Sequence, residues 1–183
     1  MKFKFKIQQY QTDAVENTVA VFSGQPSHRV AEYRRDLGKR SQQQIDFEGE
    51  TGFRNHHIEL DGRTLLKNIN AIQNLYDITP SATLSKGVGA VNLDIEMETG
   101  TGKTYVYIKT MFELNKQYGW NKFIIVVPSI AIREGVAKSF KMLEEHFMEY
   151  YGKKARWFIY NSSNLQQLDS FSSDSEQSVK IIN

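Results

Sequence analysis

One stretch of the chain limits its possible folds more than any other. Between residues 91 and 118 an alternating apolar segment, a glycine-rich turn and a helix-like segment follow one another. Residues 91–96 alternate apolar and polar side chains, as a half-buried strand does. The turn reads Met-Glu-Thr-Gly-Thr-Gly-Lys-Thr at residues 97–104, and the helix predicted after it ends at Gly119, a residue type that favours helix C-termini. Strand, turn and helix in this order predict an α/β fold.

The turn fits the phosphate-binding pattern G-x-x-x-x-G-K-[ST], the Walker A motif or P-loop, with Met97 where glycine is usual. Gly100 and Gly102 allow the backbone to curl so that its N–H groups face phosphate oxygens, and the following helix adds partial positive charge. We expect Lys103 to reach the β- and γ-phosphates as the catalytic lysine and the Thr104 hydroxyl to bind Mg²⁺. The expected nucleotide-binding residues of this loop are Thr99, Gly100, Thr101, Gly102, Lys103 and Thr104.

The rest of the chain predicts a mostly parallel sheet with flanking helices, as in a P-loop NTPase. Strands are predicted at residues 3–7, 123–127, 157–160 and 179–182, and helices at residues 9–22, 62–76 and 129–150. The apolar run 123–127 suits a strand covered on both faces. Loops are expected at residues 23–61, 80–89 and 170–178. In the helix from residue 129, a core-facing stripe is expected of Ile132, Val136, Phe140, Leu143, Phe147 and Tyr150.

Composition excludes few function classes. The 23 basic and 21 acidic residues leave a net charge of +2, which is too balanced to indicate a nucleic-acid partner. The chain has no cysteine, which excludes disulfides and thiolate metal sites and fits a reducing cytoplasm. No run reaches the roughly 18 apolar residues of a membrane span. We therefore expect a cytoplasmic protein without a membrane segment.

Nucleotide hydrolysis also needs a carboxylate that binds Mg²⁺ and orients the attacking water. No apolar run after the loop ends in Asp or Glu, and Asp94 and Glu96 precede the loop, where a solvent-facing or structural role is expected. The chain also ends directly after the strand predicted at 179–182, which looks like a central strand. Both observations favour a piece of a longer protein over a short protein with this strand at an edge.

At this point the residues resemble a known group. Thr-Gly-Thr-Gly-Lys-Thr at 99–104 is the form of the loop in superfamily 2 helicases and translocases. The stretches 97–107 and 123–136 are similar to the Res subunit of type III restriction–modification enzymes. The resemblance implies the N-terminal part of a first RecA-like domain. It divides the chain into a glutamine-motif region at 1–22, an insertion at 23–90 and the P-loop core at 91–183.

The resemblance also implies roles for single residues. Gln11 would read the adenine edge, and Pro128, Ser129 and Arg133 belong to the family's motif Ia, on the side of the domain that binds DNA. The whole enzyme would use ATP and Mg²⁺ to move along double-stranded DNA and would cut it with a separate nuclease domain. Its partner would be the modification (methyltransferase) subunit. The isolated chain would bind nucleotide weakly and hydrolyse little or none.

Several alternatives stay open. Gln11 could be an ordinary exposed glutamine, Tyr10 could stack on a base or belong to the core, and Ser129 could only cap a helix. The pair His56 and His57 lacks a third ligand for a metal. For the whole protein, the rivals are another superfamily 2 helicase or translocase, a small-molecule kinase or nucleotide switch, and a non-catalytic nucleic-acid-binding module.

Overall fold

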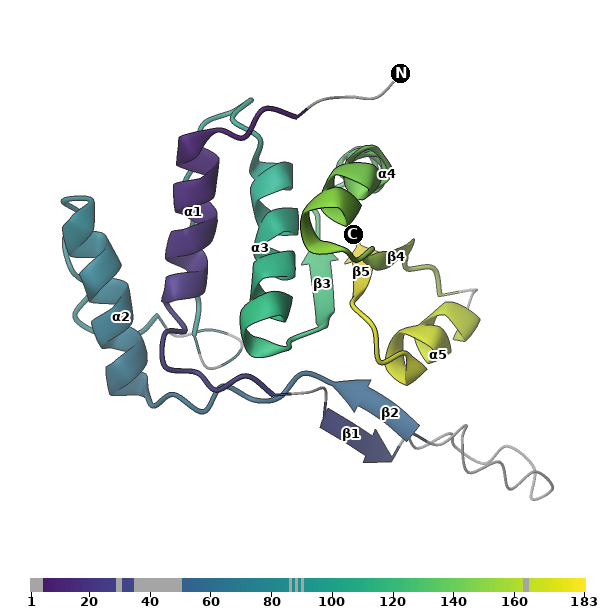
Figure 1. The fold of residues 1–183 in the computed structure, drawn as a ribbon, viewed down its shortest axis with the longest axis horizontal. Helices are drawn as coiled ribbons and strands as arrows, with labels where there is room; N and C mark the ends of the chain where they lie inside the picture. The colour runs from purple at the N-terminus through teal and green to yellow at the C-terminus, as the bar shows by residue number, and fades with distance from the viewer. Residues whose placement is uncertain are drawn as a thin grey trace. The chain divides into compact units, whose positions relative to one another are not determined.

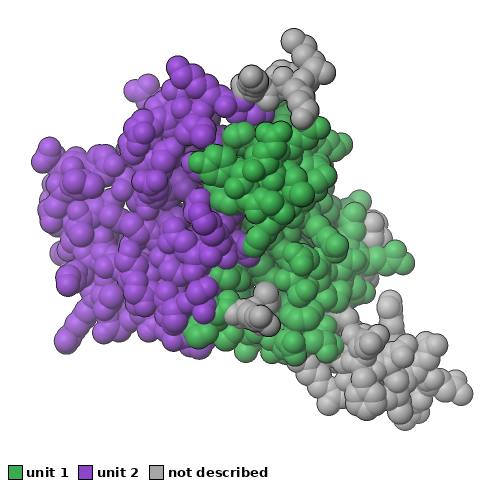
Figure 2. Space-filling model, viewed as in Figure 1, with its two compact units in different colours: residues 1–3, 28–56, 119–183 green, residues 4–27, 57–118 purple. Residues whose placement is uncertain are grey.

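The chain forms two compact units, which Figure 2 draws in different colours. The computed structural model describes residues 5–28, 31–34, 51–85, 87, 89, 91–162 and 165–183. Unit 1 contains the described residues within 28–56 and 119–183, and unit 2 those within 4–27 and 57–118. In chain order the elements are α1 (Gln9–Ala20), β1 (Ala31–Arg34), β2 (Thr51–Arg54), α2 (Gly62–Leu75), α3 (Lys103–Tyr118), β3 (Lys122–Val126), α4 (Ile130–Tyr151), β4 (Arg156–Ile159), α5 (Leu165–Ser173) and β5 (Ser178–Ile182) (Figure 1).

A parallel sheet of three strands forms the centre of unit 1. Its order is β3-β5-β4, so the strand predicted at 179–182 is central, as expected. Phe123 and Trp157 lie opposite Val179, and Ile125 lies opposite Ile181. Val179 and Ile181, which lie on the same face of β5, have no exposed surface. The sheet and its helices confirm the predicted α/β class and are consistent with part of a RecA-like domain.

Helix α4 covers one face of this sheet. The ring of Phe140 stacks on Trp157 with centroids 5.8 Å apart, and Ser129 caps the helix by accepting a hydrogen bond from Ile132 N–H. The predicted stripe is buried from Val136 to Phe147, but Ile132 and Tyr150 at its ends are exposed. Because α4 has 22 residues, it is about 33 Å long, whereas a strand of five residues covers about 17 Å. The sheet is therefore too short to cover the whole stripe.

The opposite face of the sheet is only partly covered. Phe171 of α5 packs edge-on against Phe158 of β4, with centroids 5.9 Å apart. On β3, however, Ile124 is 56% exposed and Val126 is 72% exposed. The prediction that residues 123–127 are covered on both faces was therefore wrong. The reason is position: β3 is an edge strand of the described sheet, and α5 packs mainly against β2 and β5, which leaves Ile124 and Val126 exposed.

Two short strands lie in the region that we expected to be a loop. β1 and β2 pair antiparallel, with Glu32 opposite Phe53, so the prediction of an irregular segment at 23–61 was wrong there. After β2, the Asn55 side chain binds the start of β3. Its Oδ1 accepts hydrogen bonds from the backbone N–H groups of Asn121 and Lys122, and its Nδ2 donates to Lys122 O, each at 2.8 Å. Asn55 therefore joins this pair of strands to the parallel sheet.

Unit 2 is built around the pair α1 and α3, which lie side by side (Figure 1). Val15 and Val19 of α1 are buried, and Tyr118 at the end of α3 donates from its hydroxyl to Val19 O at 3.2 Å. Helix α2 is joined to the end of α1 by Asn68, whose Nδ2 donates to Val21 O and Ser23 O. The helices predicted at 9–22, 62–76 and 103–118 are confirmed.

The strand predicted at residues 91–96 does not form. These residues belong to unit 2, and no described strand pairs with them. Apolar alternation is necessary for a half-buried strand but does not suffice, because a strand also needs a neighbour for its backbone hydrogen bonds. The prediction of a strand at 3–7 was also wrong for its described part. Residues 3 and 4 lie outside the described residues, and residues 5–7 are not in a strand.

The loop predicted at residues 170–178 was too long, because α5 continues to Ser173. Two serines at the end of α5 donate hydrogen bonds to carbonyl groups of the same helix. Ser172 Oγ donates to Leu168 O, and Ser173 Oγ donates to Asp169 O. The loop predicted at 80–89 contains no helix or strand among its described residues. In the described part of the chain, no helix is both long and apolar enough to cross a membrane.

Replacing Asn55 by alanine tests the join between β2 and β3. Removal of three hydrogen bonds to backbone groups should lower the free energy of unfolding by about 2–3 kcal/mol, measured by urea denaturation. Asn74→Ala is the control, because Asn74 is exposed on α2 and alanine suits a helix. Equal losses in the two variants would contradict the role of Asn55.

A second stability test compares two glycines in the left-handed region. Gly119 has φ +76° and Gly152 has φ +66°, but a Cβ at Gly119 would overlap His28 O, whereas a Cβ at Gly152 meets nothing within 4 Å. Both Gly→Ala variants should lose about 1–2 kcal/mol from backbone strain. Gly119→Ala should lose about 1–3 kcal/mol more from overlap, read from thermal unfolding. Similar losses would show that the His28 segment moves away without cost.

Candidate functional site

The glycine-rich turn at 97–104 has the backbone that its sequence predicts. Gly100 has φ +83° and Gly102 has φ +89°, a region that other residues rarely adopt. Helix α3 begins immediately afterwards at Lys103, so the loop leads directly into a helix N-terminus. A glycine-rich turn that leads into a helix N-terminus is the arrangement in which backbone N–H groups and the helix dipole can bind an anion.

Side-chain donors bind the carbonyl groups of this loop. The Lys103 ammonium donates to Met97 O at 2.6 Å and to Glu98 O at 2.9 Å. The Thr101 hydroxyl also donates to Glu98 O, at 2.6 Å. Lys103 is exposed, and its ammonium lies on the loop's own carbonyl oxygens. A phosphate oxygen would offer this ammonium a negatively charged acceptor in place of neutral carbonyls.

Thr104, the predicted Mg²⁺ ligand, lies in the first turn of α3. Its side chain is hydrogen-bonded to Tyr107, and burial raises the pKa of the Tyr107 hydroxyl. A metal ion would have to share or replace that bond. Asp94 and Glu96, which precede the loop, are exposed.

The loop also contacts the first turn of α1. Gln11 Nε2 donates to Thr101 O at 2.8 Å, and the Tyr10 hydroxyl donates to the same oxygen at 3.2 Å. The sequence singled out Gln11 only for a base-reading role and left Tyr10 between base stacking and the core. Tyr10 is 49% exposed and therefore lies outside the core. No local pattern reveals these contacts, because 90 and 91 residues separate the partners along the chain.

A cavity of about 830 Å³ adjoins the loop within unit 2. Helix α1 contributes Tyr10, Asp13 and Asn17 to its lining, helix α2 contributes Ile69 and Ile72, and the loop region contributes Met97, Glu98 and Thr101. Gln11 is not among the lining residues. Its side chain lies against the loop, where a Cβ on Gly102 would be 2.5 Å from Gln11 Nε2.

The second predicted site lies in unit 1, at the carboxyl end of β3. Pro128 is exposed, Ser129 caps α4, and Arg133 follows in the first turn of that helix. Arg133 donates to Asn183 Oδ1 at 2.7 Å and forms an ion pair with Glu134 at 3.2 Å. Asn183 follows β5, so the contact joins the carboxyl ends of two neighbouring parallel strands. The sequence did not indicate Asn183.

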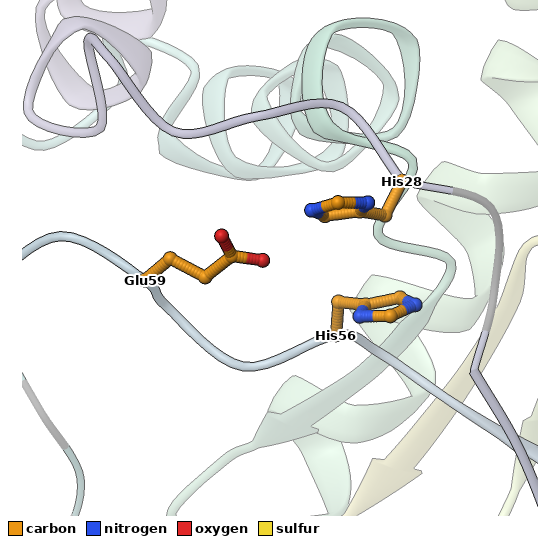
Figure 3. A group of neighbouring side chains, drawn as sticks. All are labelled: His28, His56 and Glu59. Atoms are coloured by element: carbon orange, nitrogen blue, oxygen red, sulfur yellow. The ribbon is translucent and has the colours of Figure 1, made fainter.

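The two adjacent histidines do not act together. His56 belongs to unit 1, where its ring stacks on His28 with centroids 4.6 Å apart and planes 30° apart (Figure 3). His57 belongs to unit 2, where its carbonyl accepts a hydrogen bond from Gln25 Nε2 at 3.3 Å. The pair His56–His57 therefore gives no shared ligand set.

Comparison with known proteins agrees with the predicted family. The family described as "Type III restriction enzyme, res subunit" matches residues 4–182. The chain is 39% identical over 110 residues to the EcoP15I Res subunit of Escherichia coli and, to the same extent, to the EcoPI Res subunit of Escherichia phage P1. Each match covers 59% of this chain and 11% of the relative.

A third relative is the StyLTI Res subunit of Salmonella typhimurium (strain LT2), which is 51% identical over 63 residues, or 33% of this chain and 6% of the relative. The matches with this chain therefore span only a small part of the relatives' length, 11% of the first two and 6% of the third. Because the family match extends from residue 4 to residue 182, over nearly the whole chain, the chain belongs to the family of type III restriction enzyme Res subunits.

Proposed function

We propose that the loop at residues 97–104 binds the triphosphate of Mg²⁺–ATP in the helicase-like part of a Res subunit. The observation that carries the proposal is the loop itself: two glycines at positive φ directly before a helix that begins with Lys103. Backbone N–H groups from Thr99 to Thr104 would bind phosphate oxygens. The family match supports the proposal, since type III Res subunits resemble superfamily 2 motors that use this loop.

Two side chains would change partners when the nucleotide binds. The Lys103 ammonium would leave Met97 O and Glu98 O for the β- and γ-phosphates. The Thr104 hydroxyl would become a Mg²⁺ ligand, for which hydroxyl oxygen is a suitable donor. Space for a phosphate group is available beside Gly100, where a Cβ would meet nothing within 4 Å. Magnesium would neutralise the phosphates and position them for attack by water.

By resemblance, Gln11 is the residue expected to read adenine. A carboxamide can donate and accept at once, which matches the adenine edge. The bond to Thr101 O uses one of its two N–H groups. The other N–H and the oxygen would suffice for adenine.

We further propose that Pro128, Ser129 and Arg133 contact the phosphate backbone of double-stranded DNA. They lie at the carboxyl end of β3 and the start of α4, where the helix dipole and cap favour anions. Arg133 is positioned by Asn183, which limits the rotamer entropy that it would lose on binding. In the whole protein these contacts would belong to a motor that moves along DNA.

The names of the relatives support a proposal for the activity of the whole protein. We propose that the whole protein is an ATP-dependent type III restriction endonuclease of the cytoplasm. It would cleave DNA as part of a complete restriction–modification system, with the modification subunit as its partner. The relatives are named as Res subunits of restriction–modification enzymes, and this chain corresponds to 11% of the first two. We expect the 183-residue chain by itself to bind nucleotide but not to turn it over.

Lys103→Ala tests the nucleotide site. Loss of the ammonium should weaken Mg²⁺–ATP binding at least about tenfold, because charge-assisted hydrogen bonds to phosphate are lost. The measurement is isothermal titration calorimetry on the purified chain. Lys116→Ala is the matched control: it removes the same charge from the same helix, at a side chain that is 66% exposed. Equal binding by the two variants would contradict the proposal.

The same preparation tests catalysis. Phosphate release by the wild-type chain should not exceed that of buffer, because no carboxylate follows an apolar run after the loop. ATP turnover that disappears in Lys103→Ala would show that this chain alone contains the catalytic groups.

Arg133→Ala tests the DNA contact. Affinity for duplex DNA at low salt should fall about three- to tenfold for all sequences alike, and the salt dependence should decrease by about one phosphate contact. Fluorescence anisotropy with two unrelated duplexes measures both. Lys138→Ala removes a charge from an exposed position farther along α4 and should have little effect. A loss confined to one duplex sequence, or the same loss in Lys138→Ala, would contradict a backbone contact by Arg133.

A further inference from the structure

The contact between α1 and the phosphate loop converges on one carbonyl group. Gln11 Nε2 and the Tyr10 hydroxyl both donate to Thr101 O, at 2.8 and 3.2 Å. A carbonyl oxygen has two lone pairs, so these donors can satisfy it completely. Thr101 lies between Gly100 and Gly102, which both have positive φ.

Helix α1, which carries these two donors, is held in place by its own hydrogen bonds and by its packing. Its first turn closes with hydrogen bonds from the N–H groups of Gln11 and Thr12 to Gln8 O. Farther along, Val15 and Val19 are buried, and the Tyr118 hydroxyl binds Val19 O. The two donors therefore come from a helix that is itself fixed to α3, the helix that the loop begins.

The orientation of Thr101 O determines that of the next amide. A trans peptide group is planar, and its C=O and N–H point in opposite directions. With Thr101 O bound toward α1, the N–H of Gly102 points away from α1. Glycine at position 102 would otherwise permit this peptide group to rotate, because it lacks a Cβ and populates both signs of φ.

Gln11 also packs on the loop. A Cβ on Gly102 would lie 2.5 Å from Gln11 Nε2, so the side-chain amide of Gln11 lies near the α-carbon of Gly102, on the side where a Cβ would project. The residue does not line the neighbouring cavity, whereas Tyr10 does. Gln11 Nε2 thus binds the carbonyl oxygen of this peptide group and also lies near the α-carbon of Gly102.

We propose that Gln11, assisted by Tyr10, is a positioning residue of the phosphate loop, and that it orients the Gly102 amide toward the triphosphate whichever base the nucleotide carries. This inference rests on the proposed nucleotide-binding function of the loop. It is additional to the proposed contact with adenine, because a positioning residue affects the phosphates of every nucleotide and of a polyphosphate that has no base.

The test measures three ligands with the 183-residue chain by isothermal titration calorimetry: Mg²⁺–ATP, Mg²⁺–GTP and magnesium tripolyphosphate, which has no base. Gln11→Ala should weaken GTP and tripolyphosphate by the same factor, about three- to tenfold, the range expected for one lost hydrogen bond. ATP should weaken by at least that factor, because the proposed contact with adenine is lost as well. Tyr10→Phe removes only a hydroxyl and should weaken all three about two- to threefold. Gln11→Glu keeps the size but offers no donor, so its loss should be at least as large as that of Gln11→Ala.

Gln9→Ala is the matched control. Gln9 occupies the same first turn, but its Nε2 donates to Asp13 Oδ1 and makes no bond to the loop. Its affinities should equal those of the wild type. If Gln11→Ala lowers the unfolding midpoint so far that it cannot be titrated, Tyr10→Phe decides, because it changes one half-exposed hydroxyl.

The outcomes separate the two proposals. Weakened ATP binding with unchanged tripolyphosphate binding would overturn the positioning role and assign Gln11 to the base. Unchanged affinity for all three ligands in both variants would overturn the inference alone. A wild-type chain that binds none of the three would overturn the proposed function and, with it, the inference.

Discussion

The hydrogen bonding of the loop carbonyls is the constraint on which the candidate site depends. Lys103 binds Met97 O and Glu98 O, and Gln11 and Tyr10 bind Thr101 O. Because each trans peptide group points its N–H opposite to its C=O, fixing these oxygens also fixes the amides that follow them. For the proposed anion site, the bonds from Gln11 and Tyr10 to Thr101 O would preorganise the loop, and preorganisation of this kind lowers the cost of binding.

The parallel sheet of unit 1 organises the second candidate site by a different means. Strands β3 and β5 run in the same direction, so Ser129 and Asn183 emerge at the same edge of the sheet. Arg133 meets Asn183 there, in the first turn of α4. Carboxyl ends of parallel strands are the usual place for ligand sites in open α/β sheets, and a helix N-terminus beside them favours phosphate.

The sequence predictions were more accurate for features set by neighbouring residues than for features set by residues far apart in the chain. Helix α3 begins and ends where predicted, because the loop before it and Gly119 after it are local signals. The strand predicted at 91–96 failed for lack of a described pairing partner, and the pair β1–β2 was missed because two strands of four residues carry little periodicity. In the site, the two glycines and Lys103 were predictable from their spacing. The donors to Thr101 O were not, since they come from a helix some 90 residues earlier in the sequence.

The sequence by itself determined the glycine-rich loop before α3, the three helices of unit 2 and the family, because each depends on residues adjacent in the chain. The tertiary structure decided which side chains act on that loop and which strands pair. It brings Gln11 and Tyr10 to Thr101, Asn55 to the start of β3, and Asn183 to Arg133. The physical reason is that a hydrogen bond depends on distance and direction in space. Spacing along the chain sets these only within a single turn, helix or strand.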